Sequence, residues 1–271
     1  MTDFTISSRA AEDGRHTLLR TIESAVIPRL ILAHREGAAT TAVRPVCAQD
    51  EVSESQVLEF TQIVLRGNDS AARSFVVKLQ NEGISTDCIR LELLAPAARR
   101  LGLFWELEQA DFIQVTLGLR CLQQVAHRLG EDDAGEGIVL HGHKALLVAL
   151  PGEQHVFGMQ LVSDMLRKAG WDIWDAPGAN EQDIIALVKN EWFAVVGLSI
   201  SVPEQLESLT LIIRQIRRHS VNRGVGVMVG GHPFEGLEDC AARVGADATA
   251  RDGRDAVKQA KKLLELMSQR N

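Results

Sequence analysis

The sequence lacks the features that mark several large classes of protein. Its four cysteines are scattered without a Cys-x-x-Cys pair, which indicates neither a disulfide framework nor a zinc site. No apolar run approaches the ~20 residues of a membrane span, and residues 1–15 contain no apolar signal-peptide region. The formal charge of −7 argues against a protein that binds the phosphate backbone of nucleic acids. We therefore expect a reduced, cytoplasmic protein that is not inserted in a membrane.

What the sequence does contain is enough apolar material for one large domain or two ordinary ones. Its 271 residues are 45% apolar and 24% charged, values typical of a globular protein. Residues 1–51 predict an N-terminal extension, with one helix from His16 to about Glu36 and a small, polar linker after it.

Residues 52–130 predict a small helical bundle, because apolar residues recur there at helical spacing between short connections. Each of the first three helices is expected to begin at a capping side chain and to end at a glycine. The expected caps are Ser53, Asn68 or Asp69, and Ser85 or Thr86, and the expected breaks are Gly67, Gly83 and Gly102. A longer helix is expected from Phe104 to Leu129.

After an acidic, glycine-rich linker at 131–143 the pattern changes. Residues 144–271 alternate short apolar runs with longer amphipathic runs, which predicts βαβ units. The fold class expected is thus α + α/β: a helical cap followed by a flavodoxin-like, Rossmann-like domain with a five-stranded parallel sheet. Ligands of such sheets bind at the carboxyl ends of the strands, and His155, Ser199 and Gly231 each follow a predicted strand.

Three of these strand ends carry residues suited to a flat ligand that contains a metal. The first loop holds Glu153 and His155, whose imidazole could ligate a metal while the carboxylate fixes its other nitrogen. The other two loops offer the hydroxyls of Ser199 and Ser201 and the glycine pair at 230–231. The loops contain no nucleophile–base pair, no GxGxxG follows the first strand, and GxxxxGK[ST] does not occur. A macrocyclic cofactor is favoured, and a loop histidine bonded to backbone is the alternative for His155.

These loops resemble the B12-binding domain family, whose pattern is Asp-x-His-x-x-Gly, then Ser-x-Leu, then Gly-Gly. The chain has Glu-x-His-x-x-Gly at 153–158, Ser-Ile-Ser at 199–201 and Gly-Gly at 230–231, at the spacing of the family. The resemblance implies cobalamin bound in the base-off form, with His155 as the lower axial ligand of cobalt and a slot for the dimethylbenzimidazole tail. The cofactor-binding residues that it implies in these loops are Glu153, His155, Phe157, Gly158, Ser199, Ser201, Gly230 and Gly231.

The helical segment resembles the cap that precedes such domains, in which a tryptophan covers the upper face of the corrin. Trp105 is the corresponding residue, and burial as an ordinary core aromatic is the alternative. In light-sensing cobalamin regulators of the CarH type, a Glu-His pair follows that tryptophan, whereas this chain has Val115 and Thr116 at the same spacing. Hydroxo- or aquocobalamin is therefore expected rather than adenosylcobalamin. The first acid, Glu153, resembles those regulators, and Ser201 replaces the family leucine.

Residues 53–270 resemble the AerR/PpaA proteins of purple photosynthetic bacteria. The resemblance implies a non-enzymatic, cobalamin-dependent antirepressor that senses light or B12 and binds a CrtJ/PpsR-type repressor of photosynthesis genes. A corrinoid carrier of a methyltransferase system is the alternative, and a mutase subunit is disfavoured because the chain has no catalytic barrel. The heme-associated sensor domain of AppA is a related resemblance, which makes heme the alternative cofactor. Residues 1–50 contain no recognised DNA-reading module, so any contact with DNA would be indirect.

Overall fold

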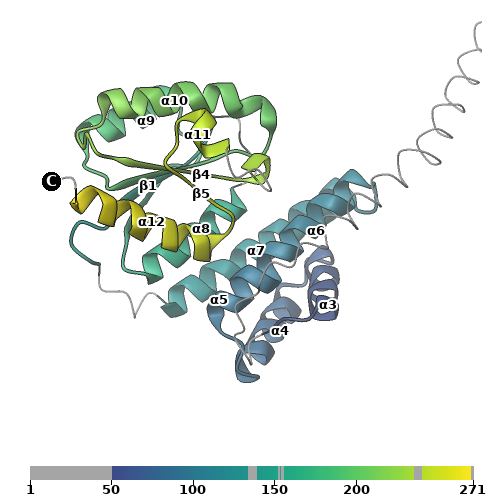
Figure 1. The fold of residues 1–271 in the computed structure, drawn as a ribbon. Helices are drawn as coiled ribbons and strands as arrows, with labels where there is room; N and C mark the ends of the chain where they lie inside the picture. The colour runs from purple at the N-terminus through teal and green to yellow at the C-terminus, as the bar shows by residue number, and fades with distance from the viewer. Residues whose placement is uncertain (1–50, 134–138, 152, 154–155, 235–239, 270–271) are drawn as a thin grey trace, which may run out of the picture. The chain divides into compact units, whose positions relative to one another are not determined.

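The computed structural model describes residues 51–133, 139–151, 153, 156–234 and 240–269 (Figure 1). The chain divides into two units, 1–48 and 49–271, and every described residue belongs to the second. The helix expected from His16 to Glu36 lies outside the described residues.

The cap is built from helices whose first residues are capped where the sequence predicts. Ser53 and Gln56 form a reciprocal capping box at the start of α3, and the side chains of Asn68 and Ser85 accept backbone N–H groups at the next two starts. A π-helix follows α5 without a break and leads directly into α6. The helices of the cap are α3 (Glu54–Leu65), α4 (Asp69–Asn81), α5 (Thr86–Cys88), the π-helix η2 (Ile89–Leu94), α6 (Ala95–Glu106) and α7 (Phe112–Asp133).

The expectation that Gly102 separates two helices is wrong. Gly102 lies inside α6, because an interior glycine weakens a helix by only about 1 kcal/mol and keeps both of its backbone hydrogen-bonding groups. The chain turns instead at Glu108, which has a left-handed φ of 55°. Asp111 then opens α7 in a box with Gln114, with N–H to side-chain oxygen distances of 2.8 and 2.9 Å. Helix α7 continues to Asp133, so the first residues of the expected linker are helical.

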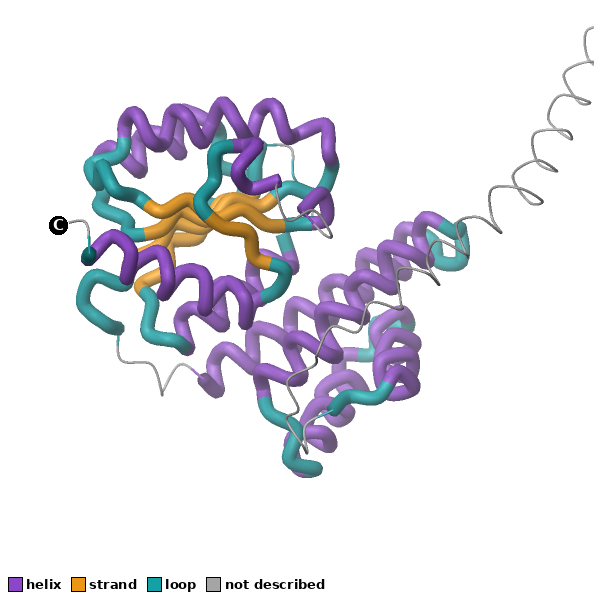
Figure 2. Tube along the Cα trace, viewed as in Figure 1, coloured by secondary structure: helices purple, strands orange, loops and turns teal. Residues whose placement is uncertain are grey.

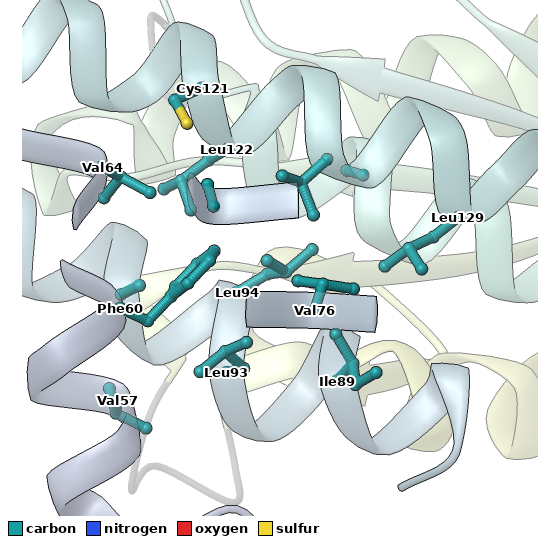
Figure 3. Packing of buried hydrophobic residues seen from close by; sticks show 14 of the residues in the cluster. Val57, Phe60, Val64, Val76, Ile89, Leu93, Leu94, Cys121, Leu122 and Leu129 are labelled. Atoms are coloured by element: carbon teal, nitrogen blue, oxygen red, sulfur yellow. The ribbon is translucent and has the colours of Figure 1, made fainter. Parts of the chain in front are cut away.

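The cap has its own apolar core. Figure 3 shows side chains of α3, α4, the π-helix and α7 that point toward one another, with Phe60 and Leu122 among them. Phe60 also packs against Phe75, with ring centroids 5.5 Å apart. The same buried cluster includes Phe157 and Leu161 of helix α8, so this core joins the cap to the α/β domain.

The α/β domain has the expected five-stranded parallel sheet, with strand order β2-β1-β3-β4-β5 (Figure 2). This flavodoxin-like order confirms the predicted fold. The strands are β1 (Lys144–Ala149), β2 (Asp172–Asp175), β3 (Val195–Ser199), β4 (Gly226–Gly230) and β5 (Ala248–Ala250).

Helices cover both faces of this sheet (Figure 1). One face packs against α8 (Phe157–Lys168) and α12 (Gly253–Ser268). The other packs against α9 (Glu181–Asn190), α10 (Leu206–His219) and α11 (Cys240–Val244). Because both faces are buried, the central strands are apolar throughout and offer polar groups only at their ends. Two short 3₁₀ turns, η3 (Pro203–Gln205) and η4 (His232–Phe234), follow β3 and β4.

Candidate functional site

The carboxyl ends of β1, β3 and β4 lie side by side. Ala149 is the register partner of Ser199, and Ser199 is the register partner of Gly230. The ladder continues past the strands, because the Leu150 N–H donates to the Ser199 carbonyl and the Ile200 N–H donates to the Gly230 carbonyl, each at 3.2 Å. The structure thus brings together the second and third predicted loops and the start of the first.

Glu153 connects the first of these loops to the second. Its Oε2 accepts a hydrogen bond from the backbone N–H of Ser201 at 2.6 Å, and its own N–H donates to the Leu150 carbonyl at 2.9 Å. The sequence predicted Glu153 as a support for the His155 ring, and the bond to Ser201 is an additional role that it did not predict. His155 lies outside the described residues, so its axial role stays a prediction.

The glycine pair shapes the fourth strand end. Gly231 has a φ of +108°, and a Cβ built on it would overlap the carbonyl oxygen of Ile200. A Cβ on Gly230 would lie 3.1 Å from the Ala250 carbonyl oxygen. Gly231 is therefore required by the backbone of the loop after β3, whereas a side chain at Gly230 would meet only a tight contact with β5. The sequence assigned them to a ligand slot, and the structure adds this reason within the protein itself.

The remaining predicted residues of the first two motifs differ from one another in how far they are buried. Phe157 begins α8 and is buried in the cap core. Gly158, one residue later, is exposed, and among the described residues no atom beyond its chain neighbours and its own helix backbone lies within 4 Å of where its Cβ would be. Ser199 and Ser201 are both half-buried. Phe157 therefore anchors the loop to the cap, while Gly158 and the serines leave room for a ligand.

Trp105 is not an ordinary core residue, because 51% of its surface is exposed. Its ring lies edge-on to that of Phe112, with centroids 6.3 Å apart and an interplanar angle of 68°. Three further exposed apolar side chains lie close in sequence around the connection between α6 and α7, and we call the set of five the cap-tip patch. It consists of Leu103, Trp105, Leu107, Phe112 and Ile113. Of these, the exposed Trp105–Phe112 ring pair is a candidate contact for a ligand or partner.

A network of charged side chains joins the cap to α8, and the sequence did not predict it. Arg90 of the π-helix is completely buried, and its Nη1 lies 2.6 Å from Oδ2 of Asp133 at the end of α7. Lys168 of α8 lies 3.1 Å from Asp87 and 3.4 Å from Asp133. Asp164 of α8 also has a buried oxygen, Oδ2, without a hydrogen-bond partner. We call these five residues the cap junction.

Two residues of the cap junction have a raised pKa, Lys168 and Asp164. Burial lowers the pKa of Lys168, but hydrogen bonds and charges from Asp87 and Asp133 outweigh it and the pKa is raised. Burial raises the pKa of Asp164, although the nearby charges of Arg90 and Arg167 oppose the rise.

In the described part of the chain, no group of three or more His, Cys, Asp or Glu side chains is arranged to hold a metal ion. A surface depression of about 550 Å³ between α9 and α10 is lined by residues from Glu181 to Asn190 and by Gln215, away from the strand ends. Within the described ranges, no helix combines the length and the apolar character needed to cross a bilayer. The cytoplasmic location stays a prediction.

Residues 143–261 match the B12 binding domain family. This part of the chain, which holds the parallel sheet, is therefore similar to a B12-binding domain. The match runs from the residue before β1 into α12 and includes all of the strand-end residues described above. The cap lies outside it.

Several known proteins are similar to this chain. An uncharacterized 20.5 kDa protein in the bchF-crtJ intergenic region of Rhodobacter capsulatus is 28% identical over 159 residues, or 58% of this chain and 81% of that protein. Dimethylamine corrinoid protein 3 of Methanosarcina acetivorans is 29% identical over 129 residues, which are 47% of this chain and 57% of that protein. The monomethylamine corrinoid protein of Methanosarcina barkeri shares the fold, with a TM-score of 0.66 and 17% identity over 79% of this chain and 100% of that structure.

Proposed function

We propose that the chain is a cobalamin-binding regulator, not an enzyme, that uses His155 as the lower axial ligand of cobalt and acts through a CrtJ/PpsR-type repressor of photosynthesis genes. The observation that supports cobalamin as the cofactor is the position of the motif residues in the fold. Glu153, Ser199, Ser201 and the glycine pair lie at adjacent strand ends within the B12-binding domain.

The described residues fit a corrinoid with a nucleotide tail. Ser199 and Ser201 are half-buried and Gly158 faces open space, so a tail could enter beside them. The exposed ring of Trp105, which Phe112 contacts edge-on, is proposed to cover the opposite face of the macrocycle. When bound, the corrinoid supplies a cobalt ion whose upper ligand can exchange. The protein's part is to hold the ring through His155 and to sense the upper ligand through the cap.

The choice between regulator and carrier rests on the relatives and on the sequence. The Rhodobacter capsulatus relative takes its name from a region beside crtJ, which supports a regulator. The dimethylamine corrinoid proteins support the alternative, a corrinoid carrier of a methyltransferase system. Val115 and Thr116, in place of Glu-His after Trp105, favour hydroxo- or aquocobalamin as the bound form. The family match of residues 143–261 favours a corrinoid over heme.

Signalling requires that the cap differ between two ligand states of cobalt. Phe157 and Leu161 of α8 pack in the cap core, and α8 starts directly after the His155 loop. We infer that a change at cobalt moves this loop, and that α8 passes the movement to the cap. The repressor would then distinguish the two arrangements of the cap.

The axial-ligand role is tested by absorbance spectra of purified protein with hydroxocobalamin, in light and in dark. His155→Ala should lose the spectral shift that marks nitrogen ligation and should bind the cofactor more weakly. His141→Ala, an exposed histidine before β1, is the matched control and should behave as wild type. If His155→Ala keeps both binding and the spectral shift, cobalt ligation by His155 is excluded.

Regulator and carrier are separated by two assays on the same preparation. Protein loaded with hydroxocobalamin should co-purify with a CrtJ/PpsR-type repressor and change the repressor's DNA binding. Protein loaded with methylcobalamin should not transfer its methyl group to a methyltransferase partner. Methyl turnover without repressor binding would establish the carrier instead.

A further inference from the structure

We propose that Glu153 is a positioning residue that clamps the loop after β3 to the loop of His155, and that this clamp requires glutamate at a position where the family pattern has aspartate. The clamp itself is a property of the protein without a cofactor. Its effect on cobalamin rests on the function proposed above.

The clamp adds a side-chain bond between two loops that a backbone bond, from the Leu150 N–H to the Ser199 carbonyl, joins only at their start. Beyond Ser199 the β3 backbone bonds to β4, because the Ile200 N–H donates to the Gly230 carbonyl at 3.2 Å. The next donor, the N–H of Ser201, points instead to the first loop and is accepted by Oε2 of Glu153 at 2.6 Å. Glu153 therefore ties Ser201, a predicted wall of the tail slot, to the loop of the predicted cobalt ligand.

The chemistry of this bond favours a carboxylate on a long side chain. Hydrogen bonds to a charged acceptor are roughly twice as strong as neutral ones. Glu153 is half-buried, where such a bond is less weakened by water than on the open surface. An aspartate is one carbon–carbon bond shorter, about 1.5 Å, which would lengthen the 2.6 Å contact beyond hydrogen-bond range.

Backbone bonds already hold the first loop close to the sheet. The length of the side chain at position 153 therefore determines whether its carboxylate reaches the Ser201 N–H. The Glu153 N–H donates to the Leu150 carbonyl at 2.9 Å, and the Leu150 N–H donates to the Ser199 carbonyl at 3.2 Å. These backbone bonds fix where the Glu153 side chain begins. A shorter side chain at 153 could reach Ser201 only if those bonds were given up.

The clamp is tested first without cofactor, by hydrogen exchange of the Ser201 amide in wild type, Glu153→Gln and Glu153→Asp. The glutamine oxygen can still accept the bond, so Glu153→Gln should exchange within about threefold of wild type. Glu153→Asp should exchange at least about tenfold faster, since the free energy of this one bond sets its protection. Glu204→Asp, an exposed glutamate in the turn after β3, is the matched control and should change nothing. Equal Ser201 protection in wild type and Glu153→Asp would overturn the clamp.

The second test asks whether Glu153 acts through Ser201 or only through His155. Glu153→Asp should bind hydroxocobalamin about tenfold more weakly, although it restores the aspartate of the family pattern, whereas Glu153→Gln should stay within about threefold. In a double-mutant cycle, the loss caused by Glu153→Asp should persist in the His155→Ala background. Unchanged affinity in Glu153→Asp, or a loss that vanishes with His155→Ala, would refute positioning through Ser201. If wild type fails to bind hydroxocobalamin, the proposed function falls, while the exchange experiment still decides the clamp.

Discussion

At the strand ends, neighbouring loops are held by backbone hydrogen bonds and by Gly231, which admits the carbonyl of Ile200 beside it. At the cap junction, contact between the cap and α8 depends on charged side chains around the buried Arg90. Backbone hydrogen bonds form with most residue types, except at positions such as 231 where only glycine fits. Buried charges depend on each partner in turn, because removing one leaves the other without compensation. The described strand ends are therefore held mainly by backbone geometry, whereas the cap is joined to α8 by an apolar core and, in addition, by charged side chains.

The largest effect should come from breaking the cap junction. Asp133→Ala leaves the Arg90 guanidinium fully buried, and among the described residues Asp87, at 3.6 Å, remains as an ion-pair partner. Loss of one partner of a buried pair costs about 3 kcal/mol, so urea unfolding should show a drop of that size. Lys78→Ala removes an exposed pair with Glu82 and should cost less than about 0.5 kcal/mol. If both variants lost the same free energy of unfolding, the Arg90–Asp133 pair would contribute no more to stability than an exposed ion pair.

A smaller loss is expected at the strand ends from Gly231→Ala. The left-handed φ and the overlap with Ile200 should destabilise the fold by about 1–3 kcal/mol and abolish hydroxocobalamin binding. Gly102→Ala is a control for which the free energy of unfolding should change in the opposite direction. It lies inside α6 with open space around it, so alanine should stabilise the fold by up to about 1 kcal/mol in thermal unfolding. Tolerance of Gly231→Ala would mean that the loops are not held by close backbone contact.

The junction should also weaken at high pH. The pKa of Lys168 is raised above its ordinary value of 10.5, so its stabilisation is complete below 10.5 and is lost as the pH rises through the folded-state pKa. Lys168→Met should be less stable than wild type by about 1 kcal/mol near pH 8, and this difference should shrink above pH 10.5. Lys168→Arg stays charged and should keep its stability over the same range. The chain has no tyrosine, so tyrosine ionisation does not contribute to the measurement. A pH-independent difference would exclude the lysine charge as the cause.

The smallest change in stability should follow Trp105→Ala in the cap-tip patch. Because Trp105 is 51% exposed, its removal should change the free energy of unfolding by no more than about 0.5 kcal/mol. Hydroxocobalamin affinity should fall by about 1 kcal/mol, the value of one aromatic contact. Trp192→Ala, 40% exposed and outside the cap, should leave the affinity unchanged in the same titration. Unaltered binding in Trp105→Ala would remove the cap-tip patch from the site.

Much of the fold follows from local patterns. Ser53, Asn68 and Ser85 cap helices where a side-chain acceptor precedes an amphipathic run, and the alternation after residue 143 produces the parallel sheet. These features depend on neighbours a few residues away, which is why they can be read from sequence. The break at Glu108 rather than at Gly102 escaped prediction because a glycine permits a turn without requiring one.

Local patterns along the chain were enough to predict the class of fold, the three strand-end motifs and their resemblance to a B12-binding domain. What the motif residues do within the protein became visible only in the folded chain: Glu153 reaches Ser201 across 48 positions of sequence, and Gly231 makes room for a carbonyl. The tertiary structure also decided that Arg90 is buried beside Asp133, although both are residue types usually found at the surface. The physical reason is the same in each case. Hydrogen bonds and ion pairs between distant segments form only when packing brings those segments together. They leave no periodic pattern in the sequence from which they could be predicted.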